Sequence, residues 1–235
     1  MAGDPLVFDI ETGAAPQEQL VDIIAKQMED WEPPKNIKDE AKIEERRNKA
    51  IEAIVNKAAL SPITGRILAI GYLNPFKNGG TCAIKGVSEG AHVPCDPCSE
   101  SDLIVQFWNT FTSGRTLLGW NILGFDLPFI HRRSIVLGID IPPMLRGDAN
   151  ARWAPLFHDI MHLWSFGLFG PDRYESLDTV CKACGIKGKM DGVDGSMFEQ
   201  MYLRGDATTR AQAIEYCKMD LLACWGVAER CGWKP

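Results

Sequence analysis

The stretch Val7-Phe8-Asp9-Ile10-Glu11-Thr12 decides how the rest of the chain is interpreted, because an apolar run ends there on two carboxylates. Side chains alternate along a strand, so Asp9 and Glu11 share one face and lie about 7 Å apart. Phe8 and Ile10 then point the other way, into a hydrophobic core. A lone DxE is more often a solvated strand end, so this pair needs support from other parts of the chain.

Two further carboxylates occur where neighbouring elements would carry them to the same point. Asp126 ends the stretch Asn121-Ile-Leu-Gly-Phe125-Asp126, at the expected start of a helix. Tyr216 and Asp220 are four residues apart in a helix expected over 211–230, so they lie one turn apart on one side of it. Taken singly, an FD pair at a helix start is more often a cap with a core aromatic. A Tyr-xxx-Asp pair is usually an exposed flank.

Taken together, the four carboxylates point to a metal site. Carboxylates held side by side repel each other, and burial raises their pKa values unless a cation neutralises them. Their hard oxygen atoms suit Mg²⁺ or Mn²⁺ rather than a soft metal. The set therefore predicts a site for two divalent cations that hydrolyses a phosphodiester.

The same residues resemble the motifs of the DEDD superfamily of 3′→5′ exonucleases, in the subgroup whose third motif is YxxxD. The DxE of Asp9 and Glu11 is similar to the first motif, NxxxFD to the second and YxxxD to the third. The nearest likeness is to stand-alone relatives of the proofreading domain of family B DNA polymerases. The resemblance runs from about residue 6 to 230. It implies an α/β chain with the ribonuclease H-like fold.

The resemblance also implies a role for each residue. Asp9, Glu11 and Asp220 would hold the cation that binds the attacking water, and Asp126 would serve the second cation, which Asp9 bridges. Tyr216 would orient the water, because a free phenol with a pKa near 10 is a poor base at neutral pH. The residues expected to bind the substrate are Thr12, Gly13, Asn121, Phe125 and Ser176. Products would be nucleoside 5′-monophosphates released from the 3′ end.

The composition is that of a globular protein of 235 residues with 46% hydrophobic and 24% charged residues. With 25 basic and 31 acidic residues the net charge is −6, which argues against a broad basic face for duplex binding. A few nucleotides of single-stranded DNA at a 3′ end are the expected substrate. The start of the sequence has no signal-peptide pattern and no apolar run suits a membrane helix, so a cytoplasmic protein of bacterial or phage type is expected.

One domain, residues 1–235, is expected because the motifs span the chain, with a mixed five-stranded sheet flanked by helices. Residues 13–62 form a mainly helical insertion after the first strand, proposed to dock a replication or repair protein or to cover the substrate channel. Residues 87–100 form a loop insertion. Strands are expected over 5–11, 66–73, 81–86, 116–119 and 156–163, and helices over 17–26, 39–59, 101–112, 125–137, 176–185 and 211–230.

Cysteine and histidine offer a competing metal hypothesis. The pairs Cys95/Cys98 and Cys181/Cys184 have the spacing of two zinc half-sites, but the gap between them is far longer than a zinc ribbon or finger uses. Cys181 also falls in a helical apolar stripe, so a core role is favoured there. His158 and His162 are four apart like a helical metal pair, yet their surroundings are apolar and partial burial is favoured.

Two other functions stay open on the sequence alone. An RNA 3′→5′ exonuclease would carry the same motifs, because the contacts to the 2′-OH that decide sugar preference are not visible in them. A non-catalytic nucleic-acid or partner-binding module on the same fold would be expected to have lost at least one of the five motif residues.

Overall fold

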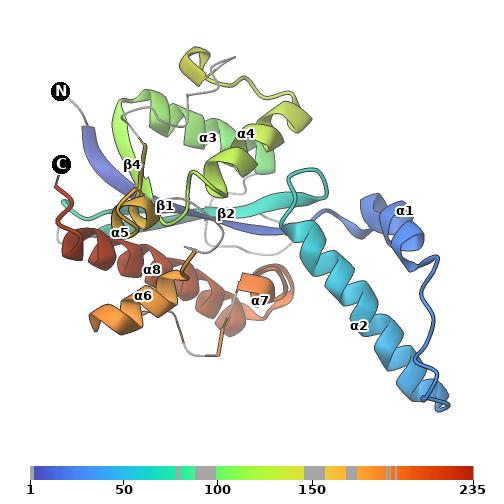
Figure 1. The fold of residues 1–235 in the computed structure, drawn as a ribbon. Coiled ribbons are helices and arrows are strands. Elements are labelled where there is room, and N and C mark those ends of the chain that lie inside the picture. Colours follow the sequence, from blue (N-terminus) through green and yellow to red (C-terminus); the bar gives the residue numbers. More distant parts are fainter. Residues whose placement is uncertain are drawn as a thin grey trace. The chain divides into compact units, whose positions relative to one another are not determined.

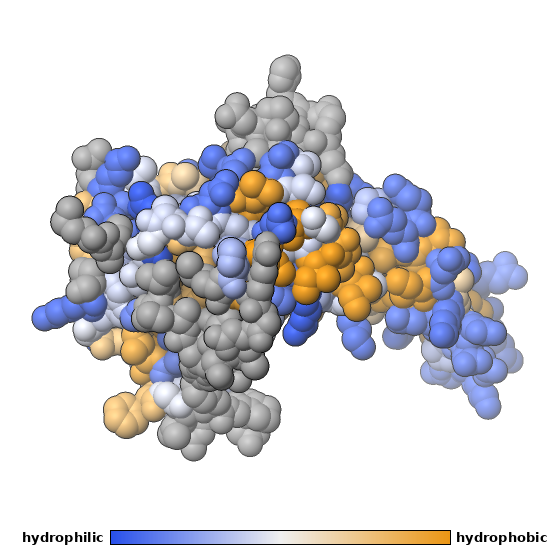
Figure 2. Space-filling view, turned by 90° about the horizontal axis from the view of Figure 1, so that it is seen from above, coloured by the Kyte–Doolittle hydropathy of each residue, from blue (hydrophilic) through white to orange (hydrophobic). Residues whose placement is uncertain are grey.

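The computed structural model describes residues 3–77, 80–87, 99–145, 157–167, 174–188, 190, 192–193 and 195–234. The chain divides into two compact units, one of residues 1–11 with 67–235 and the other of residues 12–66. Across the described residues, no helix combines the length and apolar character needed to cross a membrane. Hydrophobic residues gather near the middle of the face shown in Figure 2, with hydrophilic residues around them.

A five-stranded sheet in the order β3-β2-β1-β4-β5 forms the centre of the larger unit. β1 pairs in parallel with β4 and β4 in parallel with β5, whereas β2 and β3 are antiparallel, so the sheet is mixed as predicted. The strands are β1 (Gly3–Ala14), β2 (Gly65–Asn74), β3 (Thr81–Gly86), β4 (Arg115–Gly119) and β5 (Phe157–Asp159).

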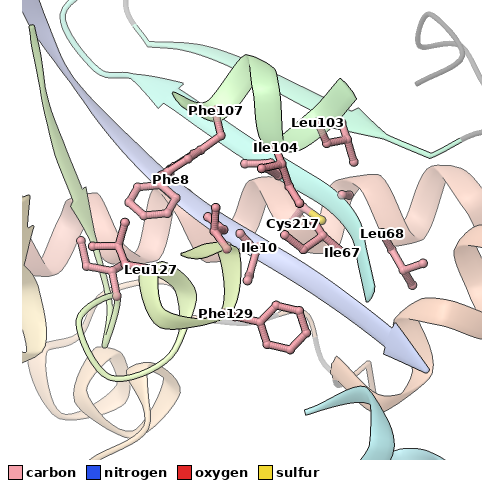
Figure 3. Close-up of a cluster of buried hydrophobic side chains, with 14 of the residues drawn as sticks. Phe8, Ile10, Ile67, Leu68, Leu103, Ile104, Phe107, Leu127, Phe129 and Cys217 are labelled. Atoms are coloured by element: carbon pink, nitrogen blue, oxygen red, sulfur yellow. The ribbon is translucent and has the colours of Figure 1, made fainter. Parts of the chain in front are cut away.

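Helices cover both faces of this sheet (Figure 1). Along β1 the side chains of Phe8 and Ile10 enter a core with α3 (Glu100–Thr112) and α4 (Asp126–Leu137). The Phe8 and Phe107 rings, 5.1 Å apart between centroids, are part of this core in Figure 3. Val7 points the other way and packs with α6 (Leu177–Cys184) and α8 (Ala207–Arg230). The alternation predicted from the sequence thus places the side chains of β1 in two core layers, one on each face of the sheet.

A partly buried ion pair connects three elements of the larger unit. Glu100 at the start of α3 accepts hydrogen bonds from Arg133 of α4, with Nε–Oε1 at 2.8 Å and Nη2–Oε2 at 2.6 Å. Glu100 Oε1 also accepts from the main-chain N–H of Ile67 in β2, at 2.8 Å. This two-pronged arrangement is the strong form of the carboxylate–guanidinium contact.

The prediction for residues 156–163 is wrong beyond the third strand residue, because β5 ends at Asp159 and the chain turns into α5 (Ile160–Trp164). The Asp159 carboxylate accepts from the Met161 N–H at 3.0 Å, which caps a helix and stops the strand. α8 begins at Ala207 rather than at 211, because Asp206 caps it through the N–H of Thr209. Residues 195–204, for which no element was predicted, form α7 (Gly195–Glu199) and the π-helix η4 (Gln200–Arg204).

The smaller unit contains α1 (Gln17–Met28) and α2 (Glu40–Ala59), close to the two helices predicted there. Asp39 caps α2 by accepting from the N–H groups of Ala41 and Lys42. A small cluster of Ala14, Leu20 and Ala58 holds the unit together.

In the larger unit, a short helical turn, η1 (Pro143–Leu145), follows α4. Much of the predicted loop insertion at 87–100, including Cys95 and Cys98, lies outside the described residues.

Candidate active site

Three of the four predicted carboxylates come together at the middle of the sheet. Asp9, Glu11 and Asp220 each offer an oxygen atom, and these atoms all lie within 4.8 Å of one another. The alternation of β1 directs Asp9 and Glu11 to the face that α8 covers, and α8 supplies Asp220. Positions 9 and 11 and position 220, far apart in the sequence, therefore form one cluster in the fold.

The chemistry of this cluster fits a divalent cation. Glu11 and Asp220 are buried, with 7% and 8% of their surface exposed, and Asp9 is half-buried. Like charges at such spacing in a shielded site are costly unless a counter-ion neutralises them. The donors are all carboxylate oxygens, which hard cations such as Mg²⁺ and Mn²⁺ prefer. The three side chains therefore already supply the kind of ligand that such a cation needs.

Asp126 lies beside this cluster and has a structural contact of its own. Its Oδ1 accepts a hydrogen bond of 3.1 Å from the main-chain N–H of Ile10, between the two acidic positions of β1. Burial raises the pKa of the Asp126 carboxyl well above its usual range, and the charge of Asp9 raises it further. The charge of Asp9 therefore acts on Asp126. Asp126 is not one of the three residues whose oxygen atoms all lie within 4.8 Å of one another.

Tyr216 lies buried on α8 one turn before Asp220, as the spacing predicted. Burial, the charges of Asp220 and Glu11, and a hydrogen bond with Asp220 all raise the pKa of the phenol. The phenol therefore keeps its proton in this environment and acts as a donor. The backbone of Gly195 comes close to it, since a Cβ at that position would stand 3.9 Å from the Tyr216 hydroxyl.

Cys217 contacts the cluster in a way that the sequence did not indicate. Its thiol donates to Glu11 Oε1 at 3.4 Å, and both residues are buried. Burial raises the pKa of this thiol, and the nearby Glu11 and Asp9 carboxylates raise it further. The thiol thus stays protonated and fixes the orientation of a carboxylate. Cys217 is a buried residue of α8, and nothing in the sequence paired it with Glu11.

Asn121 and Phe125 lie in the turn that connects β4 with α4. Asn121 has a positive φ of 58°, and its carbonyl oxygen accepts from the N–H groups of Gly124 and Phe125. Phe125 is half-buried and packs on Phe129, with ring centroids 5.6 Å apart. Gly119, just before the turn, leaves no room for a side chain, because a Cβ would stand 2.7 Å from the carbonyl oxygen of Phe8.

Asp159 is the most important residue that sequence reasoning missed. Its Oδ1 accepts from the Asn121 N–H and its Oδ2 from the Leu123 N–H, both at 2.9 Å, in addition to its contact with Met161. Burial raises the pKa of this carboxyl, while those hydrogen bonds and the nearby His162 oppose the rise. The sequence offered one signal for this residue, a carboxylate two positions after Phe157, where a short apolar run ends.

The remaining predicted binding residues occupy different positions. Ser176 caps α6, where its Oγ accepts from the Thr179 N–H at 3.2 Å and pairs with Thr179 Oγ1 at 2.8 Å. Thr12 and Gly13 are among the last residues of β1, in the smaller unit. Their contacts with a substrate stay predictions.

Histidine and cysteine have structural surroundings, as favoured from the sequence. His158 Nδ1 accepts from the Trp233 indole at 3.2 Å, while His162 lies near Asp159 with Nε2–Oδ2 at 3.9 Å. Cys181 is fully buried between α6 and α8. Among the described residues, the only group with the spacing of a metal site is the carboxylate cluster.

Comparison with known proteins connects this geometry to a family. The model of a predicted 3′-5′ exonuclease related to the exonuclease domain of PolB matches residues 62–232. The chain belongs to this family. The matched segment contains Asp126, Tyr216 and Asp220, while Asp9 and Glu11 precede it. The expected relationship to the family B exonuclease domain is thus confirmed, and assignment to the YxxxD subgroup stays a prediction.

The fold of this family member is similar to that of a solved polymerase. The family B DNA polymerase from the hyperthermophilic archaeon Pyrobaculum calidifontis aligns with 16% sequence identity and a TM-score of 0.53. The alignment covers 96% of this chain and 24% of the polymerase, so the chain spans about a quarter of that protein. The likeness supports the predicted ribonuclease H-like fold. The sequence matches no curated protein.

Proposed function

We propose that this protein hydrolyses single-stranded DNA from the 3′ end to nucleoside 5′-monophosphates, with two divalent cations, Mg²⁺ or Mn²⁺. The observation that carries the proposal is the cluster of Asp9, Glu11 and Asp220, whose oxygen atoms lie within 4.8 Å of one another. Membership of the exonuclease family supports the reaction class. A pair of cations would polarise the phosphodiester and lower the pKa of the attacking water.

The residues of the chain have separate tasks in this proposal. Asp9, Glu11 and Asp220 supply oxygen ligands for one cation, and Asp126 contributes a carboxylate toward the other. The hydrogen bond from Ile10 holds Asp126 beside Asp9, and the contact with Cys217 orients Glu11. These contacts set the carboxylates in place before the substrate arrives.

Tyr216 positions the water and does not take its proton. Its phenol stays protonated, because burial and the neighbouring carboxylates raise its pKa. The O–H donates to Asp220, and the phenol oxygen can accept one hydrogen bond from the attacking water and so orient it. A base with this pKa would be ineffective near neutral pH.

The substrate would be held by a few contacts near the site. Phe125 offers an aromatic face for a terminal base, since stacking binds single strands with little sequence preference. The main chain at Asn121, fixed by Asp159, together with Thr12, Gly13 and Ser176, would bind the terminal nucleotides. The smaller unit, with α1 and α2, is proposed to cover the substrate channel or to dock a replication or repair protein.

The proposal is tested with 5′-end-labelled single-stranded DNA, matched RNA and blunt duplex, and with unlabelled closed circular DNA, each with Mg²⁺, Mn²⁺ or EDTA. We expect stepwise shortening of single-stranded DNA from the 3′ end, slower action on duplex, and no reaction in EDTA. The Asp220→Asn variant is the matched control, because it removes one charge with little change of shape. Cleavage of circles, or equal activity in EDTA, would contradict the proposal, and faster RNA shortening would identify an RNA exonuclease.

A further inference from the structure

The face of the sheet that turns away from Asp9 and Glu11 carries a second group of polar side chains. β2 and β3 pair in the register Tyr72↔Ala83 and Asn74↔Thr81, so these four residues share one face. On β3, Thr81, Ala83 and Lys85 are all exposed, whereas Cys82 and Ile84 between them are half-buried. The α3 side of β3 is therefore accessible at the surface.

A pocket of about 430 Å³ lies over this part of the sheet. Its volume is within the range of small-molecule sites in proteins. β1, β2 and β3 form its floor, α3 borders it through polar side chains, and Arg115 stands at the start of β4. The residues used below are Tyr72, Asn74, Lys77, Lys85, Asn109 and Arg115.

The charge of this pocket contrasts with that of the chain. Lys77, Lys85 and Arg115 line it, and among the described lining residues none is acidic. The net charge of the whole chain is −6. Asp4 borders the pocket, where its carboxylate accepts from Asn74 Nδ2 at 3.4 Å and its main-chain oxygen accepts from Arg115 Nη1 at 3.4 Å. Positive charge thus prevails in the lining.

We propose that this pocket binds a phosphate group, carried either by a free nucleotide or by the backbone of a nucleic acid. Lysine provides compact positive charges, and the arginine fork matches the oxygen atoms of a phosphate. Asn74 and Asn109 add amide donors beside these cations. The site differs from the carboxylate cluster, because Leu6 in its floor points to the opposite face of β1 from Asp9 and Glu11.

The pocket can be tested without any catalysis. Binding of dAMP and of a 12-nucleotide DNA strand is measured in EDTA, by calorimetry for dAMP and by fluorescence anisotropy for the strand. The proteins are wild type, the Lys77→Ala/Lys85→Ala variant and a Lys187→Ala control. Lys187 is an exposed lysine that does not line the pocket. Thermal unfolding of each protein checks that these surface changes leave the fold intact.

We expect the double variant to bind at least one of the two ligands about tenfold more weakly, and the Lys187→Ala protein to bind like wild type. For the strand, log Kd should also depend less steeply on log salt, by about 0.7 for each phosphate that no longer meets a lysine. Weaker dAMP binding would identify a nucleotide pocket, and weaker binding of the strand alone would identify a site for the nucleic-acid backbone. Equal binding of both ligands by the double variant and wild type would overturn the proposal.

Discussion

Replacing Asp126 with asparagine should make the metal-free protein more stable and the enzyme inactive. The asparagine side chain keeps an oxygen that can accept from the Ile10 N–H, the contact that Asp126 makes at 3.1 Å. It removes the buried negative charge, whose cost is visible in the raised pKa of Asp126. The same change takes away a carboxylate that we propose for the second cation, so activity should disappear.

The size of the change in stability follows from the removed charge of Asp126 and from its hydrogen bond with Ile10. One unit of pKa difference between the folded and unfolded chain corresponds to about 1.4 kcal/mol. For a chain of this size, that free energy shifts the melting temperature by roughly 3 to 6 °C. The Asp126→Ala variant gains the same relief but leaves the Ile10 N–H without an acceptor, which costs about 1–3 kcal/mol. It should therefore melt below the Asp126→Asn protein.

The pH dependence has a definite sign. Burial, followed by the charge of Asp9, raises the pKa of Asp126 in the folded chain. Between the unfolded and the folded pKa values, the unfolded chain releases a proton that the folded chain retains. This contribution to stability is complete at acid pH and is lost as pH rises through the folded-state pKa. The asparagine variant lacks the titration, so its advantage over wild type should grow as pH rises.

Thermal unfolding in EDTA from pH 4 to pH 8, for wild type and both variants, measures these differences. A parallel assay of DNA shortening in Mg²⁺ measures activity. If the Asp126→Asn protein melts below wild type at pH 8, the buried charge is not the dominant cost. Wild-type activity in this variant would refute its role beside the second cation.

Three other perturbations test the site and the fold. The Tyr216→Phe variant should keep its structure and lose roughly 10- to 100-fold in kcat, because one hydrogen bond of about 1.5–3 kcal/mol to the reacting water disappears; unchanged kcat would exclude the positioning role. The Asp159→Ala variant should lose about 2–5 kcal/mol in urea unfolding, since three main-chain donors lose their acceptor, and Asp159→Asn should lose less. The Arg133→Met variant should lose up to about 3 kcal/mol because the partly buried Glu100 loses its charged partner, and a loss below about 1 kcal/mol would contradict this.

The sequence predicted the features that depend on local periodicity. Alternation along β1 placed Phe8 in the core and Asp9 opposite it, and helical spacing placed Tyr216 one turn from Asp220. These relations involve neighbours in the chain, whose geometry is nearly the same in every strand or helix. The link between Asp9 and Asp220 rested on the combination of acidic motifs and on the family resemblance, since no local rule joins residues so far apart.

The features that the sequence did not predict depend on contacts across the fold. Nothing near Asp159 indicates that its carboxylate accepts from Asn121, because the two are 38 residues apart. The contact between Cys217 and Glu11 spans 206 residues in the same way. The end of β5 was missed because a short apolar run is compatible with either a strand or a helix.

Asp126 and Asp159 both accept hydrogen bonds from main-chain N–H groups near the end of β4, Asp126 from β1 and Asp159 from the turn that follows β4. The pairing between β1 and β4 reaches Val7 and Leu118, and beyond it the Ile10 N–H donates to Asp126. After β4, the N–H groups of Asn121 and Leu123 donate to Asp159. Side-chain carboxylates thus accept from main-chain N–H groups that lie beyond the pairing of β1 with β4. The pairing of β1 and β4 ends there without leaving these donors unsatisfied, and Asp9 and Glu11 follow on β1 just beyond the last paired residue, Val7.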